Sequence, residues 1–297
     1  MNDKRLYILP ADSATVPVPA SDVDSVAIPN TCSNSGDARP MAIGYNNGKM
    51  YVGSVCSGQS IVEQLPLTNP TATNDITFTY SAEFDTLFGN TFYAEVFEFD
   101  LTSNTFTPSP VLTVDLTYQR GCIFRLGLSS GPSSPADCAD NGATANWRPW
   151  QPDWTQVFND QFTSGNTSND SAGNPIEYPQ PILSDIEFDG EDMILGLRDL
   201  NGDRTGHAVG APSTAIPAPG FAPTQTFRGA GLGDLLRACS TDAGYVLESN
   251  GSCGTVSTVG AGNNEGPNGG EYYWNDQTPG GPNNTSANSF PVDFDAG

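Results

Sequence analysis

Oxygen-bearing side chains alternate along the short stretch Asp199-Leu-Asn201-Gly-Asp203. Oxygen atoms at alternate positions of a tight loop can converge on one hard cation, as they do in calcium-binding loops. Glu187 and Asp189, beside the preceding turn, could supply further ligands. These five residues form a candidate Ca²⁺ site, and Ca²⁺ is the one cofactor that the sequence suggests.

The same stretch also has an explanation without a metal. Arg204 stands where calcium loops have a glycine, and Gly210 stands where they have a bidentate acid. The dipeptide Asn201-Gly202 is a strong signal for a hairpin turn, because both residues tolerate positive φ. A calcium loop and a plain turn are therefore both open interpretations.

Three tryptophans lie close together in the sequence, Trp147, Trp150 and Trp154, with Arg148 among them. Exposed tryptophan rings can stack on sugar rings, so these four residues are candidate ligand-binding residues of a glycan-binding module. The alternative is that the rings cover an end of the hydrophobic core, since large aromatic side chains are usually buried.

Paired carboxylates could catalyse glycoside hydrolysis. Glu187 and Asp189 are two residues apart on a predicted strand and so share a face, and Glu265 with Glu271 is a second pair. Such pairs arise by chance in a chain with 34 acidic residues. A secreted glycoside hydrolase therefore ranks behind the other functions, and we assign no catalytic residue.

The six cysteines predict disulfides. They are even in number and form no CxxC motif, and His207 is the single histidine, which argues against a zinc site. Disulfides indicate an oxidising, extracellular or cell-surface location. Proximity in the sequence favours three local pairs among the 15 pairings that six cysteines allow. These pairs are Cys32–Cys56, Cys122–Cys138 and Cys239–Cys253.

The net charge of −23 excludes two classes of partner. Nucleic acids and anionic membrane surfaces both need clustered cations, and Lys4 and Lys49 are the only lysines. No apolar run is long enough to cross a bilayer. The acidic surface suits divalent cations, a salty medium or solubility alone.

Alternating hydrophobic residues predict strands that position these candidate residues. Residues 38–56 and 181–198 share one plan, which is a strand, an Asn/Asp-Gly turn and an apolar strand, with Pro40 and Pro181 at the entry. In the second unit we expect one face to carry Ile182, Ser184, Ile186 and Phe188. Residues 193–197 are apolar enough for burial on both faces, and a second turn is expected at 199–203.

The strand pattern repeats, which predicts an all-β fold of four-stranded antiparallel blades in a β-propeller-like arrangement. Residues 91–100 with 111–116, and 234–239 with 245–248, complete two units. The predicted division is a half blade (1–36), a blade (37–118), a Cys/Trp-rich insertion (119–179), a blade (180–250) and a Gly/Asn-rich tail (251–297). Two and a half blades predict an incomplete ring with long loop insertions, since propellers have about 4–8 blades.

Several segments together resemble the β-propeller region of large bacterial cell-surface proteins, which often carry SdrD B-like or other immunoglobulin-like modules. The segments are RPMAIGYNNGKMYVGSVCS, YAEVFEFD, YQRGC, WRPW, YPQPILSDIEFDGEDMILGLRD, GDLLRAC and GPNGGEYYW. The resemblance extends from about Leu6 to Trp274 and implies a propeller with further blades on both sides. It implies no catalytic residues.

These observations favour a non-enzymatic extracellular module, structural or adhesive, of a bacterial surface or filament protein. The N-terminus lacks the apolar core of a signal peptide, so disulfides suggest that the chain is a piece of something longer. The expected partners are other copies of the chain or flanking domains of a longer protein, and glycans if the tryptophan segment is a platform.

Overall fold

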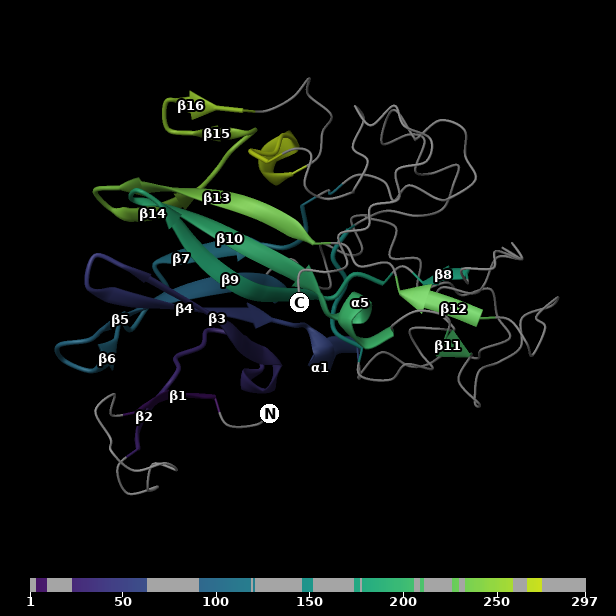
Figure 1. Ribbon diagram of the computed structural model, residues 1–297, viewed down its shortest axis with the longest axis horizontal. Helices are drawn as coiled ribbons and strands as arrows, with labels where there is room; N and C mark the ends of the chain where they lie inside the picture. Colours follow the sequence, from purple (N-terminus) through teal and green to yellow (C-terminus); the bar gives the residue numbers. More distant parts are fainter. Residues whose placement is uncertain are drawn as a thin grey trace.

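The chain is all-β and is built around a five-stranded and a four-stranded antiparallel sheet that lie face to face (Figure 1). The computed structural model describes residues 4–9, 23–62, 91–118, 120, 146–151, 174–176, 178–205, 209–210, 226–229, 233–258 and 266–273. The predicted all-β class is confirmed, and the helices among the described residues are single short turns. None of them is long and apolar enough to span a membrane.

The first sheet is a meander that begins with a tight hairpin. Its strands are β3 (Ala38–Asn46), β4 (Lys49–Cys56), β5 (Tyr93–Asp100) and β7 (Leu112–Asp115), and the short β6 (Thr105–Phe106) also pairs with β5. Asn47 and Gly48 both have positive φ, 48° and 80°. Two central residues with positive φ give the turn whose twist matches that of the flanking strands. The Asn-Gly dipeptide thus fixes the register of β3 and β4.

The second sheet follows the same plan. Its strands are β9 (Pro181–Asp189), β10 (Asp192–Asp199), β13 (Asp234–Thr241) and β14 (Gly244–Leu247). The first strand of each sheet carries a bulge at the same distance from its turn: Met41 interrupts the pairing of β3 with β4, and Ser184 that of β9 with β10. The two sheets are therefore equivalent residue by residue over their first two strands.

The bulge corrects the face pattern expected for β9. Ile182 and Leu183 are both buried, because the extra residue at Ser184 shifts the alternation by one position. β10 also differs from the expectation of burial on both faces. Met193, Leu195 and Leu197 are buried while the residues between them are half-buried, so β10 has one core face.

The two sheets approach most closely where β3 crosses β9. A Cβ atom on Gly44 would lie 2.6 Å from the carbonyl oxygen of Ile186, and one on Gly53 would lie 2.4 Å from Cδ2 of Leu183. Glycine at both positions lets the side chains of β9 fill the space above the first sheet. The core that results draws on both sheets and on Trp147.

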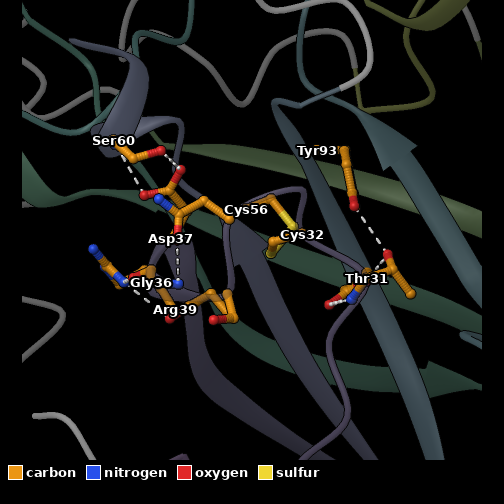
Figure 2. The surroundings of a disulfide bond; sticks show 12 residues. Thr31, Cys32, Gly36, Asp37, Arg39, Cys56, Ser60 and Tyr93 are labelled. Atoms are coloured by element: carbon orange, nitrogen blue, oxygen red, sulfur yellow. Dashed lines mark hydrogen bonds between the residues drawn. A yellow bond between two sulfur atoms is a disulfide. The ribbon is translucent and has the colours of Figure 1, made fainter. Parts of the chain in front are cut away.

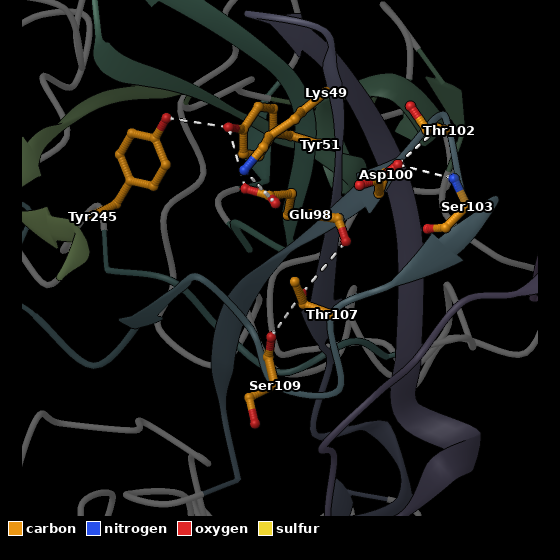
Figure 3. A network of polar contacts seen from close by, with 9 residues as sticks. All are labelled: Lys49, Tyr51, Glu98, Asp100, Thr102, Ser103, Thr107, Ser109 and Tyr245. Atoms are coloured by element: carbon orange, nitrogen blue, oxygen red, sulfur yellow. Dashed lines mark hydrogen bonds and ion pairs between the residues drawn. The ribbon is translucent and has the colours of Figure 1, made fainter. Parts of the chain in front are cut away.

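Polar contacts continue this interface toward the other edge, where β14 meets β7 (Figure 3). The hydroxyl of Tyr245 on β14 lies 3.4 Å from that of Tyr51 on β4, and the Tyr51 hydroxyl lies 3.5 Å from a carboxylate oxygen of Glu98. Lys49 pairs with Glu98 at 2.7 Å. The Tyr51 ring also packs against Phe188 and Tyr245. The interface is thus apolar at β3–β9 and aromatic with polar ends toward β14.

Smaller elements flank the two sheets. They are the pair β1 (Arg5–Ile8) and β2 (Asp24–Ala27), the sheet of β8 (Asn174–Ile176), β11 (Val209–Gly210) and β12 (Thr226–Gly229), the pair β15 (Ser252–Cys253) and β16 (Val256–Ser257), the helices α1 (Gln59–Val62) and α5 (Leu200–Thr205), and the 3-10 turns η2 (Ser35–Asp37) and η3 (Pro267–Gly269). The turn expected at 199–203 is instead the helical turn α5, so the prediction of a hairpin turn there is wrong. The β8–β12 pairing is parallel and was not predicted.

The predicted unit 37–118 contains the first sheet, and the predicted unit 180–250 contains the second. The segments 1–36, 119–179 and 251–297 carry only short strands and 3-10 turns among their described residues. The closure of such sheets into a propeller ring stays a prediction.

Gly44→Ala should destabilise the chain by about 1–3 kcal/mol, because the added methyl group meets a backbone oxygen that cannot turn aside. The measurement is urea unfolding followed by tryptophan fluorescence. Gly196→Ala is the matched control, since its Cβ would come no closer than 3.3 Å to Asp185. Equal losses for the two variants would contradict the close approach of β3 and β9.

Candidate functional site

A buried ion pair joins the segment after the first sheet to the start of β13. The Nε of Arg120 lies 3.0 Å from Oδ2 of Asp234, and both side chains are fully buried. The hydroxyl of Tyr118 donates to the same Oδ2, and the guanidinium group of Arg120 donates to the carbonyl of Gly233. Burial raises the pKa of Tyr118 well above its usual value. Charge and hydrogen bonds thus hold these two chain segments together.

Trp147 completes this buried cluster. Its ring lies under the guanidinium group of Arg120, 3.6 Å from the ring centroid, and its Nε1 donates to the Tyr118 hydroxyl at 3.1 Å. A guanidinium group over an indole face is a favourable cation–π contact, which strengthens away from water. The cluster of Arg120, Asp234, Tyr118 and Trp147 is hereafter called the arginine cluster.

Asp199 is a second buried acid, at the end of β10. Its Oδ1 accepts hydrogen bonds at 2.8 Å from the backbone N–H groups of Gln180 and Asn201. Oδ2 has no hydrogen-bond partner among the described residues. Burial raises the pKa of Asp199 to about 7, although these N–H groups and the nearby Arg120 favour the charged form. The side chain is therefore partly protonated at neutral pH.

Glu248 is a third buried acid, directly after β14. Burial raises its pKa to about 8, and the negative charge of Asp234 adds to the rise. The backbone amides of Tyr272 and Arg237 favour the charged form, but neither oxygen of Glu248 has a partner with good hydrogen-bond geometry in the described part of the chain. Glu248 is thus predominantly a neutral acid at pH 7.

Strongly shifted pKa values often mark catalytic groups, but ion-pair networks shift them as well. Here the side chains of Arg120 and Asp234 are fully buried, and Asp199 and Glu248 expose only 4% and 1% of their surface. A substrate in solution has no access to such groups. The arrangement can hold protons and fix chain segments, which is a structural role.

The structure does not bring together the five residues of the predicted calcium site. Asp199 and Asn201 are buried, whereas Asp203 is exposed and pairs with Arg198 at 2.8 Å. Asp189 and the exposed Glu187 lie beside the turn at the other end of β10. A strand of this length separates its two ends by roughly 25 Å. The structure therefore does not bring the five predicted ligands to one place, because the two turns lie at opposite ends of one strand, and Ca²⁺ binding stays a prediction.

One group among the described residues brings three potential metal-ligand atoms within 4.8 Å of one another, and it consists of Cys32, Cys56 and Glu95. The two sulfur atoms are joined in a disulfide. A disulfide sulfur is not a thiolate and does not serve as a metal ligand of the usual kind. This group is explained by covalent structure and by the contacts of Glu95.

Trp147 and Trp150 do not present the stacking surface that a glycan platform needs. Trp147 has no exposed surface and Trp150 exposes 8%. Arg39 lies over the Trp150 ring, and the ring nitrogen donates to the carbonyl of Pro181 at 2.8 Å. Arg148 lies over the ring of Tyr178. The rings of Trp147 and Trp150 are thus used in packing, as the alternative interpretation expected, and glycan binding by this segment stays a prediction.

Two of the proposed disulfides are present, Cys32–Cys56 and Cys239–Cys253, with Cα–Cα distances of 5.4 and 5.3 Å. Figure 2 shows that the first ties the segment before η2 to the end of β4. Cys122, Cys138, Trp154, His207 and Glu265 lie outside the described residues.

Further hydrogen bonds fix the same segment. Thr31 donates from its hydroxyl and its backbone N–H to the buried carboxylate of Glu95, and Asp37 accepts from the N–H and hydroxyl of Ser60 at 2.9 and 2.7 Å (Figure 2). Burial raises the pKa of Glu95, and the Thr31 hydrogen bonds oppose the rise. Glu95 on β5 and Asp234 on β13 occupy equivalent positions, since their partners across the strands are Ser54 and Leu197.

The sequence interpretation missed the arginine cluster. Its charged residues stand in two of the segments quoted above, YQRGC and GDLLRAC, but their significance appears only when a side chain is matched with one 114 residues away. A usable signal was present: in a chain with only 11 basic residues, an arginine stands two positions after a tyrosine and directly before a glycine.

Together the fold and this cluster define a disulfide-bonded all-β protein of two equivalent sheets locked by buried charge. No family model matches the chain, and no solved structure matches it significantly. The curated relatives are colossins of Dictyostelium discoideum. Colossin-A is 26% identical over 92% of this chain, Colossin-D 26% over 80% and Colossin-C 25% over 87%.

The chain spans 2%, 17% and 19% of the length of these three relatives. The relatives are proteins of a eukaryote. The resemblance to a β-propeller region of bacterial surface proteins is therefore wrong, since the matched proteins are not bacterial and no matched structure supports that family.

Arg120→Met should lower the free energy of unfolding by about 3–5 kcal/mol, because it leaves the charge of Asp234 buried without its ion-pair partner. The control is Arg198→Met, which removes the exposed pair with Asp203 and should cost under about 1 kcal/mol. Urea unfolding measures both. The double variant Arg120→Met, Asp234→Asn should regain part of the loss. A loss no larger than that of the control would contradict the role assigned to the cluster.

Stability should fall as pH rises from about 4.5 to 8. The pKa values of Asp199 and Glu248 are raised on folding, so the folded state binds protons that the unfolded state has released, and this stabilisation disappears as pH passes about 7 and about 8. Each group contributes at most about 1.4 kcal/mol per pH unit. The lowered pKa values of Asp100 and Asp192 act in the opposite direction only below about pH 4.

Asp199→Asn imitates the neutral acid and still accepts from both backbone N–H groups. Its unfolding free energy should therefore depend less on pH than that of the unaltered chain, with a relative gain at pH 8. Urea unfolding at pH 5 and pH 8 tests this. Asp203→Asn, at an exposed position, is the control. A pH dependence of Asp199→Asn identical to that of the unaltered chain would show that Asp199 is not the group responsible.

Proposed function

We propose that this chain is a non-enzymatic structural module of a larger extracellular protein. The observation that carries the proposal is its repeated construction: two antiparallel sheets of the same plan stack face to face, with a bulge and a buried acid at equivalent positions. Repeats that bury a face against each neighbour are a way to build extended proteins. The small share that the chain represents of the colossins supports this reading.

The extracellular part of the proposal is supported by the two disulfides, which persist in oxidising compartments. The predicted propeller belongs to the same proposal. Face-to-face four-stranded meanders are the packing unit of propeller blades, and the same unit can also stack without closing a ring.

The test combines a stability assay with an activity screen. Cys32→Ser with Cys56→Ser should lower the unfolding free energy by about 3 kcal/mol, since the bridge closes a loop with a sequence separation of 24. A panel of glycoside and ester substrates should show no turnover. Turnover that is lost in Glu187→Gln or Asp189→Asn, the exposed carboxylate pair on β9, would overturn the proposal.

A further inference from the structure

An exposed apolar row runs along β3. Met41, Ile43 and Tyr45 expose 49%, 56% and 65% of their surface, while Ala42 and Gly44 between them face β9. Side chains along a strand alternate between its faces, so the row lies on the side of the first sheet away from the second sheet. Three large apolar side chains in one exposed row are unusual unless something covers them.

The second sheet shows what covers the equivalent row. Ile43 stands opposite Val52 on the next strand as Ile186 stands opposite Leu195, and Tyr45 corresponds in the same way to Phe188. Ile186 exposes only 1% of its surface, because Gly44 of β3 packs against it. Phe188 packs against Tyr51 of β4. The row on β9 is thus covered by the first two strands of the preceding sheet.

The pair β1–β2 takes the place of the last two strands of a sheet that precedes β3. Thr31, shortly after β2, binds the buried acid Glu95, just as Tyr118 and Arg120, shortly after β7, bind the equivalent acid Asp234. Figure 1 shows β1 and β2 on the side of the first sheet that is opposite to the second sheet. Among the described strands β1 pairs with β2, so the pair stands where the last two strands of a preceding sheet would lie.

We propose that the apolar row of β3 receives a two-stranded β-hairpin equivalent to β3–β4, which lies beside β1 and β2 and belongs to a neighbouring repeat of the same, longer polypeptide. This inference rests on the proposed structural function and deepens it. A hairpin that fits must carry a small residue, glycine or alanine, where it crosses Ile43. It must also carry an aromatic residue beside Tyr45.

A second copy of this chain fits the row less well. The small-residue face of Ala42, Gly44 and Gly53 is already covered by the chain's own second sheet. At the equivalent positions of the second sheet, Ala42 and Gly44 are replaced by Asp185 and Glu187. Carboxylates would have to lose their water against Ile43 and Tyr45, which is costly. The hairpin of another repeat that carries small residues at these two positions avoids the cost of burying carboxylates.

The test uses as probe a labelled synthetic peptide of residues 38–56 with Cys56→Ser, which is the β3–β4 hairpin itself. Fluorescence anisotropy with the full chain should show saturable binding at micromolar concentration. Ile43→Asp in the full chain should weaken binding at least tenfold, while Val246→Asp, at a site that is 56% exposed elsewhere, should leave it unchanged. Gly44→Glu in the peptide, which copies Glu187, should also abolish binding.

A fusion guards against poor folding of the free peptide, because a tether raises the effective concentration of the hairpin. Residues 38–56 linked ahead of β1 should raise the Tm and protect Tyr45 from hydroxyl-radical oxidation, and Ile43→Asp in the body of the chain should cancel both effects. Absence of binding together with absence of protection would overturn the inference. So would a dimer of the chain alone, seen by sedimentation and dissociated by Ile43→Asp, because a second copy would then be the occupant. Neither result would bear on enzymatic activity, so the proposed function is tested separately.

Discussion

The close approach of β3 to β9 is the constraint on which the rest of the structure depends. Two sheets normally pack about 10 Å apart, with side chains of both filling the gap. Gly44 and Gly53 remove side chains from the first sheet at the crossing, so Ile186 and Leu183 of the second sheet fill the space alone. At the crossing the interface is therefore one-sided, with glycines on one face and large residues on the other, while Tyr51 and Val96 of the first sheet join the core farther along. Because of this difference, the glycine face of the first sheet must pack against the face of the second sheet that carries the large residues.

The difference between the two faces of each sheet also explains where the buried acids lie. Glu95 and Asp234 lie on the third strand of their sheets, on the face that carries the large residues. Each binds the segment that enters from the preceding unit, Glu95 through Thr31 and Asp234 through Arg120. A neutral hydroxyl satisfies the first acid and a fully buried cation the second. The cost of burying charge is offset only while the segment stays in place, so each acid also fixes the path of the chain between sheets.

Local chemistry made much of this fold predictable. Alternating residues and the Asn47-Gly48 turn fix β3 and β4 closely, and the same reasoning located β9, β10, β13 and β14. The features that the sequence did not predict depend either on contacts between distant segments or on a single residue. The bulge at Ser184 leaves no mark in a hydrophobic pattern, the parallel pairing of β8 with β12 joins segments far apart, and α5 replaces a turn that Asn201-Gly202 favoured locally. The five predicted calcium ligands lie apart for a related reason, because adjacency in the sequence says nothing about which end of a strand a turn occupies.

The far face of the second sheet shows how such a stack can end. Asp185 and Glu187 stand where the first sheet has Ala42 and Gly44, so a further sheet with large apolar residues would meet carboxylates. Near the other edge of that face, Arg237 lies against the Tyr272 ring at 4.9 Å. The Cys239–Cys253 disulfide holds β15 and β16 beside β13. Repeat proteins need a polar terminal unit of this sort, because an uncovered packing face would associate indiscriminately. The polarity of the interface, set by two glycines, thus gives the stack one face suited to continuation and one suited to solvent.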